Sequence, residues 1–226
     1  MKFENTEVFN FDGAIRGMRN PLESWQKSDS RFYQTVEYDG ILTVKNIGEK
    51  DLELMQTLIR AGSEHRKFMR QIFVSVDITA SLYWWKEFDT YKVGTAANST
   101  STMHRLASTP ITMDCFEVDD FDGLKDFSVI VNDKYVAYPI FFKFYLIGTL
   151  EQLRQKYNET KNIRYWKELI RLLPESWLQK RTVTMNYENV LNMVRQRKNH
   201  KLTEWRESFM KWAKSLPYAK ELLFIE

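Results

Sequence analysis

The fold is decided by residues 173–214, which read LPESWLQKRTVTMNYENVLNMVRQRKNHKLTEWRESFMKWAK. A Leu-Pro step leads into residues 181–185, whose β-branched side chains predict a short strand. Apolar residues at helical spacing then predict a helix over residues 188–197 and a last helix over residues 202–216. We therefore expect a strand followed by two helices.

Four polar side chains follow this strand at spacings that suggest a site: Asn186, Asn192, Arg195 and Arg197. We expect them to share one face of the helix, where a core helix has no packing use for amides and guanidinia but a site for an anionic, planar ligand does. Asn192 lies mid-helix, where asparagine has poor propensity, which favours a ligand role. Two alternatives stay open. Asn186 can cap the helix, and Arg195, Arg197 and Lys198 can form a solvated basic face.

Upstream, residues 50–102 show clear periodicity. Residues 50–61 have an apolar stripe that ends at Gly62, which predicts an amphipathic helix with a glycine just past its end. Residues 72–79 alternate between apolar and other side chains, which predicts a strand with one buried face. A helix over residues 80–92 and a small polar loop over residues 95–102 complete the predicted order.

The N-terminal part has weaker signals. Residues 1–30 show no clear period and predict an irregular start with room for one strand. Residues 32–38 and 41–45 flank Asp39-Gly40, a pair that predicts a hairpin turn.

The organisation of the whole chain points to one domain. Two further helices are predicted over residues 146–157 and 162–173. No internal repeat, low-complexity segment or linker interrupts the sequence. A chain of 226 residues, 43% hydrophobic, can build a sizeable core. We expect a single α+β domain over residues 1–226.

Composition excludes several classes of protein. A formal net charge of +3 does not support a dedicated nucleic-acid binder. No apolar run reaches about 18 residues, so no membrane helix is predicted. Cys115 is the single cysteine, which rules out an intrachain disulfide and leads us to expect a cytoplasmic protein. The three histidines are widely scattered, and no metal site is expected.

Residues 62–105 and 173–214 together resemble the flavin-dependent thymidylate synthase (ThyX) family. That family has the same order of glycine, strand, helix and polar loop, with the motif R-H-R-x-x-S at the end of the helix. Here the motif falls on residues 90–95, TYKVGT. Lys92 keeps a cation and Thr95 keeps a hydroxyl, whereas Thr90 and Tyr91 replace the first Arg and the His.

The resemblance implies a ThyX-like α+β fold, with an antiparallel or mixed sheet and flanking helices, in a homotetramer that binds FAD. Asn186 and Asn192 match the two asparagines that contact flavin and nucleotide in the family, and Arg197 matches the arginine that grips the pyrimidine. Arg197 is thus the candidate catalytic residue, able to stabilise charge on the uracil carbonyl. Lys92 and Thr95 join the two asparagines as candidate cofactor contacts. The candidate substrate contacts are Glu87, Asn98, Ser99, Thr100, Ser101, Arg105, Arg195 and Arg197.

The implied reaction is transfer of a one-carbon unit to C5 of a pyrimidine deoxynucleotide, dUMP to dTMP. NADPH and methylenetetrahydrofolate are its expected co-substrates. A second hypothesis is a protein of this fold that binds a nucleotide without catalysis, as a sensor or regulatory partner; the replacements at Thr90 and Tyr91 favour it. A third is a nucleic-acid accessory protein that uses the basic run 195–201, although the modest net charge argues against it.

Overall fold

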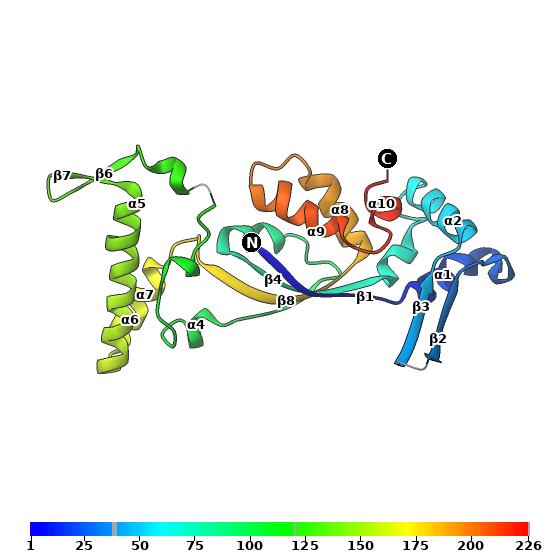
Figure 1. The fold of residues 1–226 in the computed structure, drawn as a ribbon, viewed down its shortest axis with the longest axis horizontal. Coiled ribbons are helices and arrows are strands. Elements are labelled where there is room, and N and C mark those ends of the chain that lie inside the picture. Colours follow the sequence, from blue (N-terminus) through cyan, green and yellow to red (C-terminus); the bar gives the residue numbers. More distant parts are fainter. Residues whose placement is uncertain (38–39, 120, 226) are drawn as a thin grey trace. The chain divides into compact units, whose positions relative to one another are not determined.

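The computed structural model describes residues 1–37, 40–119 and 121–225. They divide into two compact units (Figure 1). One unit contains residues 1–2, 78–90 and 98–181, and the other contains residues 3–77, 91–97 and 182–226. The expectation of a single domain stays a prediction.

The main sheet has four strands in the order β1-β4-β8-β5. These strands are β1 (Lys2–Phe9), β4 (Phe73–Ser81), β8 (Leu178–Asn186) and β5 (Ala96–Ser99). The strands predicted over residues 72–79 and 181–185 are confirmed as the two central strands, β4 and β8. Buried and half-buried residues alternate along β4, as the sequence pattern predicts.

Strand β5 corrects the prediction of a loop over residues 95–102. All four of its residues are exposed, and it lies at the edge of the sheet. A strand without a buried face needs no alternation of apolar residues, so its sequence gives no strand signal.

In the unit that contains residues 3–77, 91–97 and 182–226, the predicted helices are confirmed. Its helices are α1 (Phe11–Arg19), α2 (Glu49–Arg60), α8 (Tyr187–Arg197), the π-helical η7 (Glu204–Phe209), α9 (Met210–Lys214), α10 (Ala219–Leu222) and the short turns η1 (Asn20–Leu22), η2 (Trp25–Lys27) and η3 (Lys67–Gln71). Gly62 follows the end of α2 with φ 110°, the left-handed conformation that the sequence predicts there. Helix α1 was not expected. It contains Gly13 and Gly17, which weaken its helix propensity, but it buries an apolar face.

The hairpin expected after residue 30 is confirmed. Strands β2 (Arg31–Glu37) and β3 (Gly40–Asn46) pair antiparallel, with Arg31 opposite Asn46. The predicted turn falls partly on residues 38 and 39, which lie outside the described residues.

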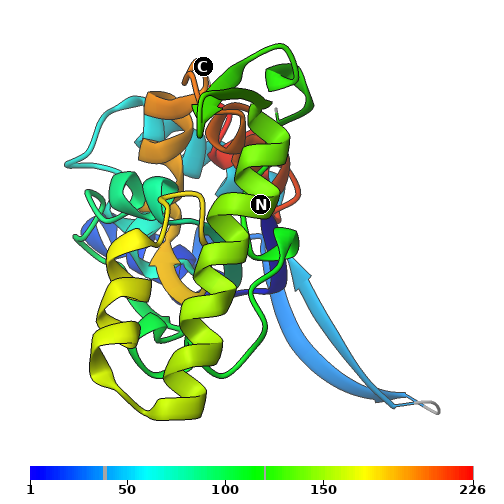
Figure 2. The ribbon, with the colours of Figure 1, turned by 90° about the vertical axis from the view of Figure 1, so that its left-hand side faces the viewer.

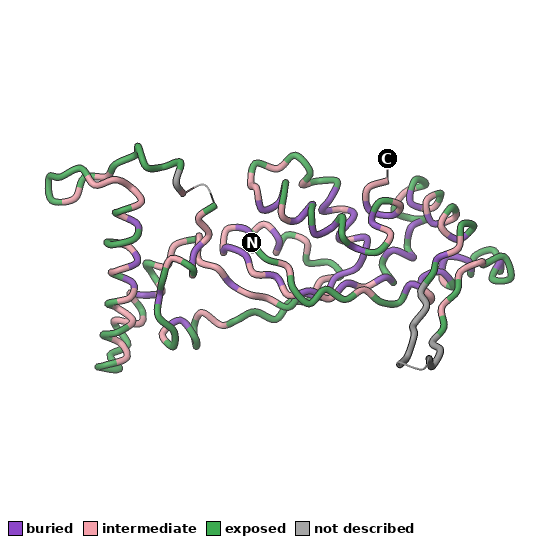
Figure 3. The backbone as a smooth tube through the Cα atoms, in the orientation of Figure 1, coloured by how far each residue is buried: buried purple, intermediate pink, exposed green. Residues whose placement is uncertain are grey.

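The other unit holds the remaining elements: α3 (Leu82–Phe88), α4 (Thr102–Arg105), η4 (Met113–Cys115), η5 (Phe121–Leu124), β6 (Ser128–Val131), β7 (Lys134–Ala137), α5 (Tyr138–Ile140), the π-helical η6 (Phe141–Ile147), α6 (Gly148–Thr160) and α7 (Ile163–Leu172). Helices α6 and α7 lie side by side (Figure 1, Figure 2) and confirm the two helices predicted there. The β6–β7 hairpin was not expected. It is largely exposed (Figure 3), and only Asn132-Asp133, both with positive φ, mark its turn.

Helix α3 is shorter than the predicted helix over residues 80–92. It ends at Phe88, and residues 89–90 and 93–94 form turns. The Thr90 hydroxyl donates to the Glu87 carbonyl at 2.7 Å, and Gly94 has φ 78°. Both features favour a turn over a continued helix. No helix in the described ranges combines the length and the apolarity needed to cross a bilayer.

Candidate functional site

The start of α8 is built by a reciprocal cap. The Asn186 side-chain oxygen accepts from the Asn189 N–H at 2.9 Å, and the Asn189 side-chain oxygen accepts from the Asn186 N–H at 3.1 Å. Such a capping box satisfies two backbone donors that a helix start leaves open. The capping alternative for Asn186 is therefore confirmed, and its ligand role stays a prediction.

The segment that contains residues 91–95 is fastened to this helix start. The Asn189 amide donates to the Val93 carbonyl at 2.7 Å. A Cβ atom on Gly94 would lie 2.7 Å from the Asn186 side-chain nitrogen, so only glycine allows the segment to approach this closely. The Thr95 hydroxyl donates to the Tyr91 carbonyl at 2.9 Å, and Lys92 is exposed. The structure thus brings Lys92 and Thr95 into one segment beside Asn186.

Arg197, at the other end of α8, is held by aromatic side chains. Its Nε donates to the Tyr91 hydroxyl at 2.8 Å, and that hydroxyl donates to Gln196 at 3.0 Å. The guanidinium lies 5.1 Å from the Trp205 ring centroid and 5.5 Å from that of Tyr91. These cation–π contacts and the hydrogen bond fix the direction of the guanidinium. Tyr91, which stands where the resembling family has His, therefore contributes to the orientation of Arg197.

A second group of charged residues lies on another side of α8. Glu188 accepts from Arg66 Nε at 3.2 Å and from Arg70 Nε at 2.6 Å, one arginine on each carboxylate oxygen. A second nitrogen of Arg66 reaches the Asn192 side-chain oxygen at 3.5 Å. Arg195 follows Asn192 by three residues, so Glu188, Asn192 and Arg195 share one helix face. We call Arg66, Arg70, Glu188, Asn192 and Arg195 the arginine cluster.

Burial and charge shape the arginine cluster. Arg66 is only 9% exposed and Glu188 only 6%. The hydrogen bond and the charge of Glu188 raise the pKa of Arg70. The pKa of Arg195 is lowered, first by burial and then by the positive charge of Arg66. The like charge of Arg66 thus disfavours the charged form of Arg195.

The expectation that four polar residues share one helix face is wrong. Arg197 lies five residues after Asn192, which at 3.6 residues per turn is about 140° around the helix axis. Asn192 and Arg195 belong to the arginine cluster, whereas Arg197 contacts Tyr91 and Trp205. Arg197 therefore lies on a different side of α8 from Asn192 and Arg195.

The sequence reading missed Arg66, Arg70 and Glu188 as site residues. Two signals were present. Arg66 and Arg70 are four residues apart, and Glu188, Asn192 and Arg195 have the spacing i, i+4, i+7. Nothing local indicates that η3 packs on α8, because that contact joins residues more than a hundred positions apart.

The remaining predicted contacts belong to the other unit: Glu87, Asn98, Ser99, Thr100, Ser101 and Arg105. Asn98 and Ser99 lie on the exposed strand β5. The Thr100 N–H donates to the Lys180 carbonyl at 2.8 Å. The Ser101 hydroxyl accepts from the His104 N–H at 3.1 Å as the cap of α4. Several polar groups that were predicted to hold phosphate thus already serve the local fold.

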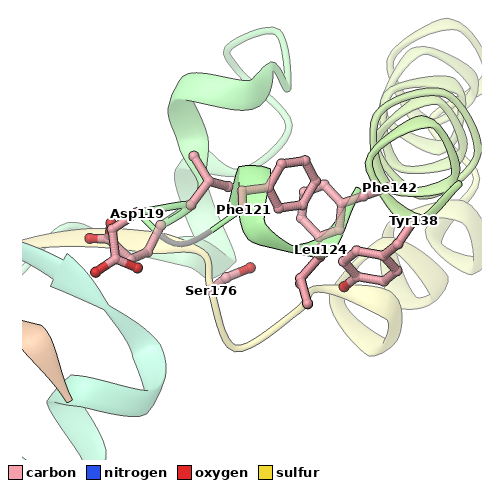
Figure 4. Close-up of a pocket in the computed structure, with 8 residues that line it drawn as sticks. Asp119, Phe121, Leu124, Tyr138, Phe142 and Ser176 are labelled. Atoms are coloured by element: carbon pink, nitrogen blue, oxygen red, sulfur yellow. The ribbon is translucent and has the colours of Figure 1, made fainter. Parts of the chain in front are cut away.

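That unit also contains a pocket of about 280 Å³. It is lined by Glu117, Val118, Asp119, Phe121, Leu124, Tyr138, Phe142 and Ser176. Figure 4 shows the rings of Phe121 and Phe142 next to each other, with Asp119 at the end away from Tyr138. The Phe121 and Phe142 ring centroids are 5.2 Å apart. The eight lining residues include none of the contacts predicted from the sequence.

Among known proteins, only solved structures match this chain, and they support its fold. No family model matches this chain, and neither does any curated protein. Among solved structures the chain is similar to Thymidylate Synthase X (ThyX) from Helicobacter pylori with FAD and dUMP, with a TM-score of 0.64 and 19% identity over 99% of this chain and 97% of that one. A second structure of ThyX from Helicobacter pylori, complexed with FAD and dUMP, gives a TM-score of 0.64 and 20% identity over 99% and 98%. The chain has the ThyX-like α+β fold that the resemblance implies.

Proposed function

We propose that this protein is a flavin-dependent enzyme that transfers a one-carbon unit to C5 of a pyrimidine deoxynucleotide, with dUMP to dTMP as the reaction. The observation that carries the proposal is the likeness to ThyX over 99% of the chain, in which α8 presents Asn186, Asn192 and Arg197. The Helicobacter pylori ThyX structures contain FAD and dUMP.

The residues present fit the chemistry of FAD. FAD is a dianionic dinucleotide, and the arginine cluster offers guanidinium groups, which bind phosphate oxygens in pairs. The Asn186 and Asn192 amides can donate to and accept from a flat heterocycle. When bound, a reduced flavin supplies the hydride that the reaction needs, and NADPH and methylenetetrahydrofolate are the expected co-substrates.

Arg197 is the proposed catalytic residue. A guanidinium whose direction is already fixed can stabilise the negative charge that develops on a uracil carbonyl without reorganisation at the moment of reaction. The Tyr91 hydroxyl and the Trp205 ring hold Arg197 in this way. Lys92 and Thr95 are the proposed contacts to an anionic group on the segment beside α8.

A specific observation favours the second candidate, a protein that binds a nucleotide without catalysis. Thr90 and Tyr91 replace two cationic or titratable residues of the resembling motif. Their hydroxyls are engaged inside the protein, Thr90 with Glu87 and Tyr91 with Arg197 and Gln196. Both positions therefore serve the local fold where the family uses them for ligand contact.

The absorbance spectrum of the purified protein separates these candidates. The protein is mixed with excess FAD, desalted and scanned for the oxidised-flavin band, and a parallel sample is mixed with dUMP and followed by thermal unfolding. Retained flavin supports the enzyme. A colourless protein whose unfolding midpoint rises with dUMP supports nucleotide binding without flavin, because a ligand that binds only the folded state stabilises it.

A further inference from the structure

We infer that the arginine cluster is a binding site for a phosphate or diphosphate group, which Arg195 and Arg66 grip while Glu188 positions Arg66 and Arg70. The inference deepens the proposed function, because FAD and dUMP both carry such a group. The charges of the arginine cluster support the phosphate site by themselves, so this site can exist whether or not the protein binds flavin.

The cluster carries more positive than negative charge. Glu188 is its one carboxylate, and each of its oxygens already accepts from one arginine, Arg66 or Arg70. The cluster therefore contains three guanidinium groups and one carboxylate, an excess of two positive charges. Glu64 also acts on Arg70, and counting it still leaves one positive charge in excess.

Arg195 is the residue that the fold does not need in this place. Within residues 1–37, 40–119 and 121–225, no carboxylate forms a salt bridge with Arg195. Glu188 suffices to hold Arg66 and Arg70, so a purely structural cluster would not require a third guanidinium. Like charges brought together raise the free energy of the site unless an anion lies between them.

The geometry places the excess charge in one spot. Arg66 is nine-tenths buried, and its guanidinium reaches the Asn192 side-chain oxygen at 3.5 Å. Asn192 is one turn before Arg195 on the same helix face. Arg66 therefore reaches Asn192 with its guanidinium, Arg195 follows Asn192 by one turn on the same face, and the Asn192 amide nitrogen adds a donor. Two planar guanidinium groups and an amide on one face suit the tetrahedral oxygens of a phosphate group.

Calorimetric titration of the full chain with inorganic pyrophosphate at low salt tests the inference. The variant is Arg195→Gln, which removes one exposed charge and no ion pair of the fold. The matched control is Arg206→Gln, the same substitution at an exposed arginine that pairs with Glu207. Thermal unfolding of both variants verifies that each folds as the parent does.

We expect pyrophosphate to bind the parent and the control equally and the Arg195→Gln variant at least tenfold more weakly. Equal binding by all three proteins, or no heat with millimolar pyrophosphate, would overturn the inference. Displacement of bound pyrophosphate by FAD or by dUMP then identifies which ligand supplies the phosphate. Pyrophosphate binding in a protein that retains no flavin would uphold this site while the flavin enzyme fails. Flavin retention without pyrophosphate binding would overturn the phosphate site and leave the flavin enzyme in place.

Discussion

At the scale of single residues, α8 carries two arginines in different surroundings, Arg197 and Arg195. Arg197 is stacked on Trp205 and hydrogen-bonded to Tyr91, an arrangement that aims a positive charge. Arg195 belongs to a cluster with an excess of positive charge, an arrangement that attracts an anion. Two arginines only two positions apart are thus expected to serve different parts of a ligand.

We expect Arg197→Gln to abolish detectable dUMP binding in calorimetry. The same change should lower the free energy of unfolding by about 2 kcal/mol, since it removes the hydrogen bond to Tyr91 and the cation–π contacts with Tyr91 and Trp205. Lys198→Gln, the next and exposed position, removes the same charge and should bind dUMP like the parent. Parental dUMP affinity in the Arg197 variant would remove Arg197 from the site.

Glu151 predicts a defined acid sensitivity. Its hydrogen bonds with Arg154, and less so with the Ile111 N–H and Gln155, outweigh burial and lower its pKa from 4.5 to about 2. A carboxyl whose pKa is lower in the folded state stabilises the fold above its unfolded pKa and loses that contribution as pH falls. The free energy of unfolding should therefore decrease from about pH 4.5 to about pH 2.

Urea unfolding across that pH range measures this effect. Glu151→Gln should remove part of the acid dependence, whereas Glu168→Gln, in an exposed pair with Arg171, should leave it unchanged. Identical pH slopes for the Glu151 variant and the parent would show that this carboxyl does not contribute.

At the scale of elements, what the sequence predicted depended on burial. Strand β4 and helices α2 and α8 bury one face, and their apolar periods predicted them closely. Strand β5 is exposed throughout and the β6–β7 hairpin has no fully buried residue, so neither has the apolar alternation of a strand with a buried face. The cap at Asn186 was predictable from residue type, whereas the pairing of η3 with α8 was not, because only tertiary packing creates it.

The junction between residues 91–95 and α8 gives a prediction for Gly94. Alanine there would meet the Asn186 amide at 2.7 Å and would have to keep a φ of 78°. We expect Gly94→Ala to lower the free energy of unfolding by about 1–3 kcal/mol, the cost of a strained backbone position. Gly148→Ala is the matched control, since its Cβ meets open space and its helical φ of -58° suits alanine.

Urea unfolding of the two glycine variants compares them directly. The Gly148 variant should be as stable as the parent or slightly more stable. A Gly94 variant as stable as the parent would mean that residues 91–95 can move away from α8 without cost, and the close approach would then have no role in holding the segment.

At the scale of the whole molecule, the ThyX-like fold extends over 99% of the chain although the identity is only 19%. The resemblance that suggested this fold depended on the order and spacing of few residues. The structure confirms the fold, and membership of the family stays a prediction. The homotetramer implied by the same resemblance stays a prediction. Light scattering on the purified protein should give the mass of four chains, and a stable monomer would contradict it.

The central claim is that this chain forms dTMP from dUMP. The most direct measurement supplies the purified protein with FAD, NADPH, methylenetetrahydrofolate and dUMP and follows the nucleotide by mass spectrometry. We predict dTMP that accumulates only when FAD is present and that Arg197→Gln does not form. Unchanged dUMP, in a protein shown to bind both FAD and dUMP, would contradict the claim and leave nucleotide binding without catalysis as the function.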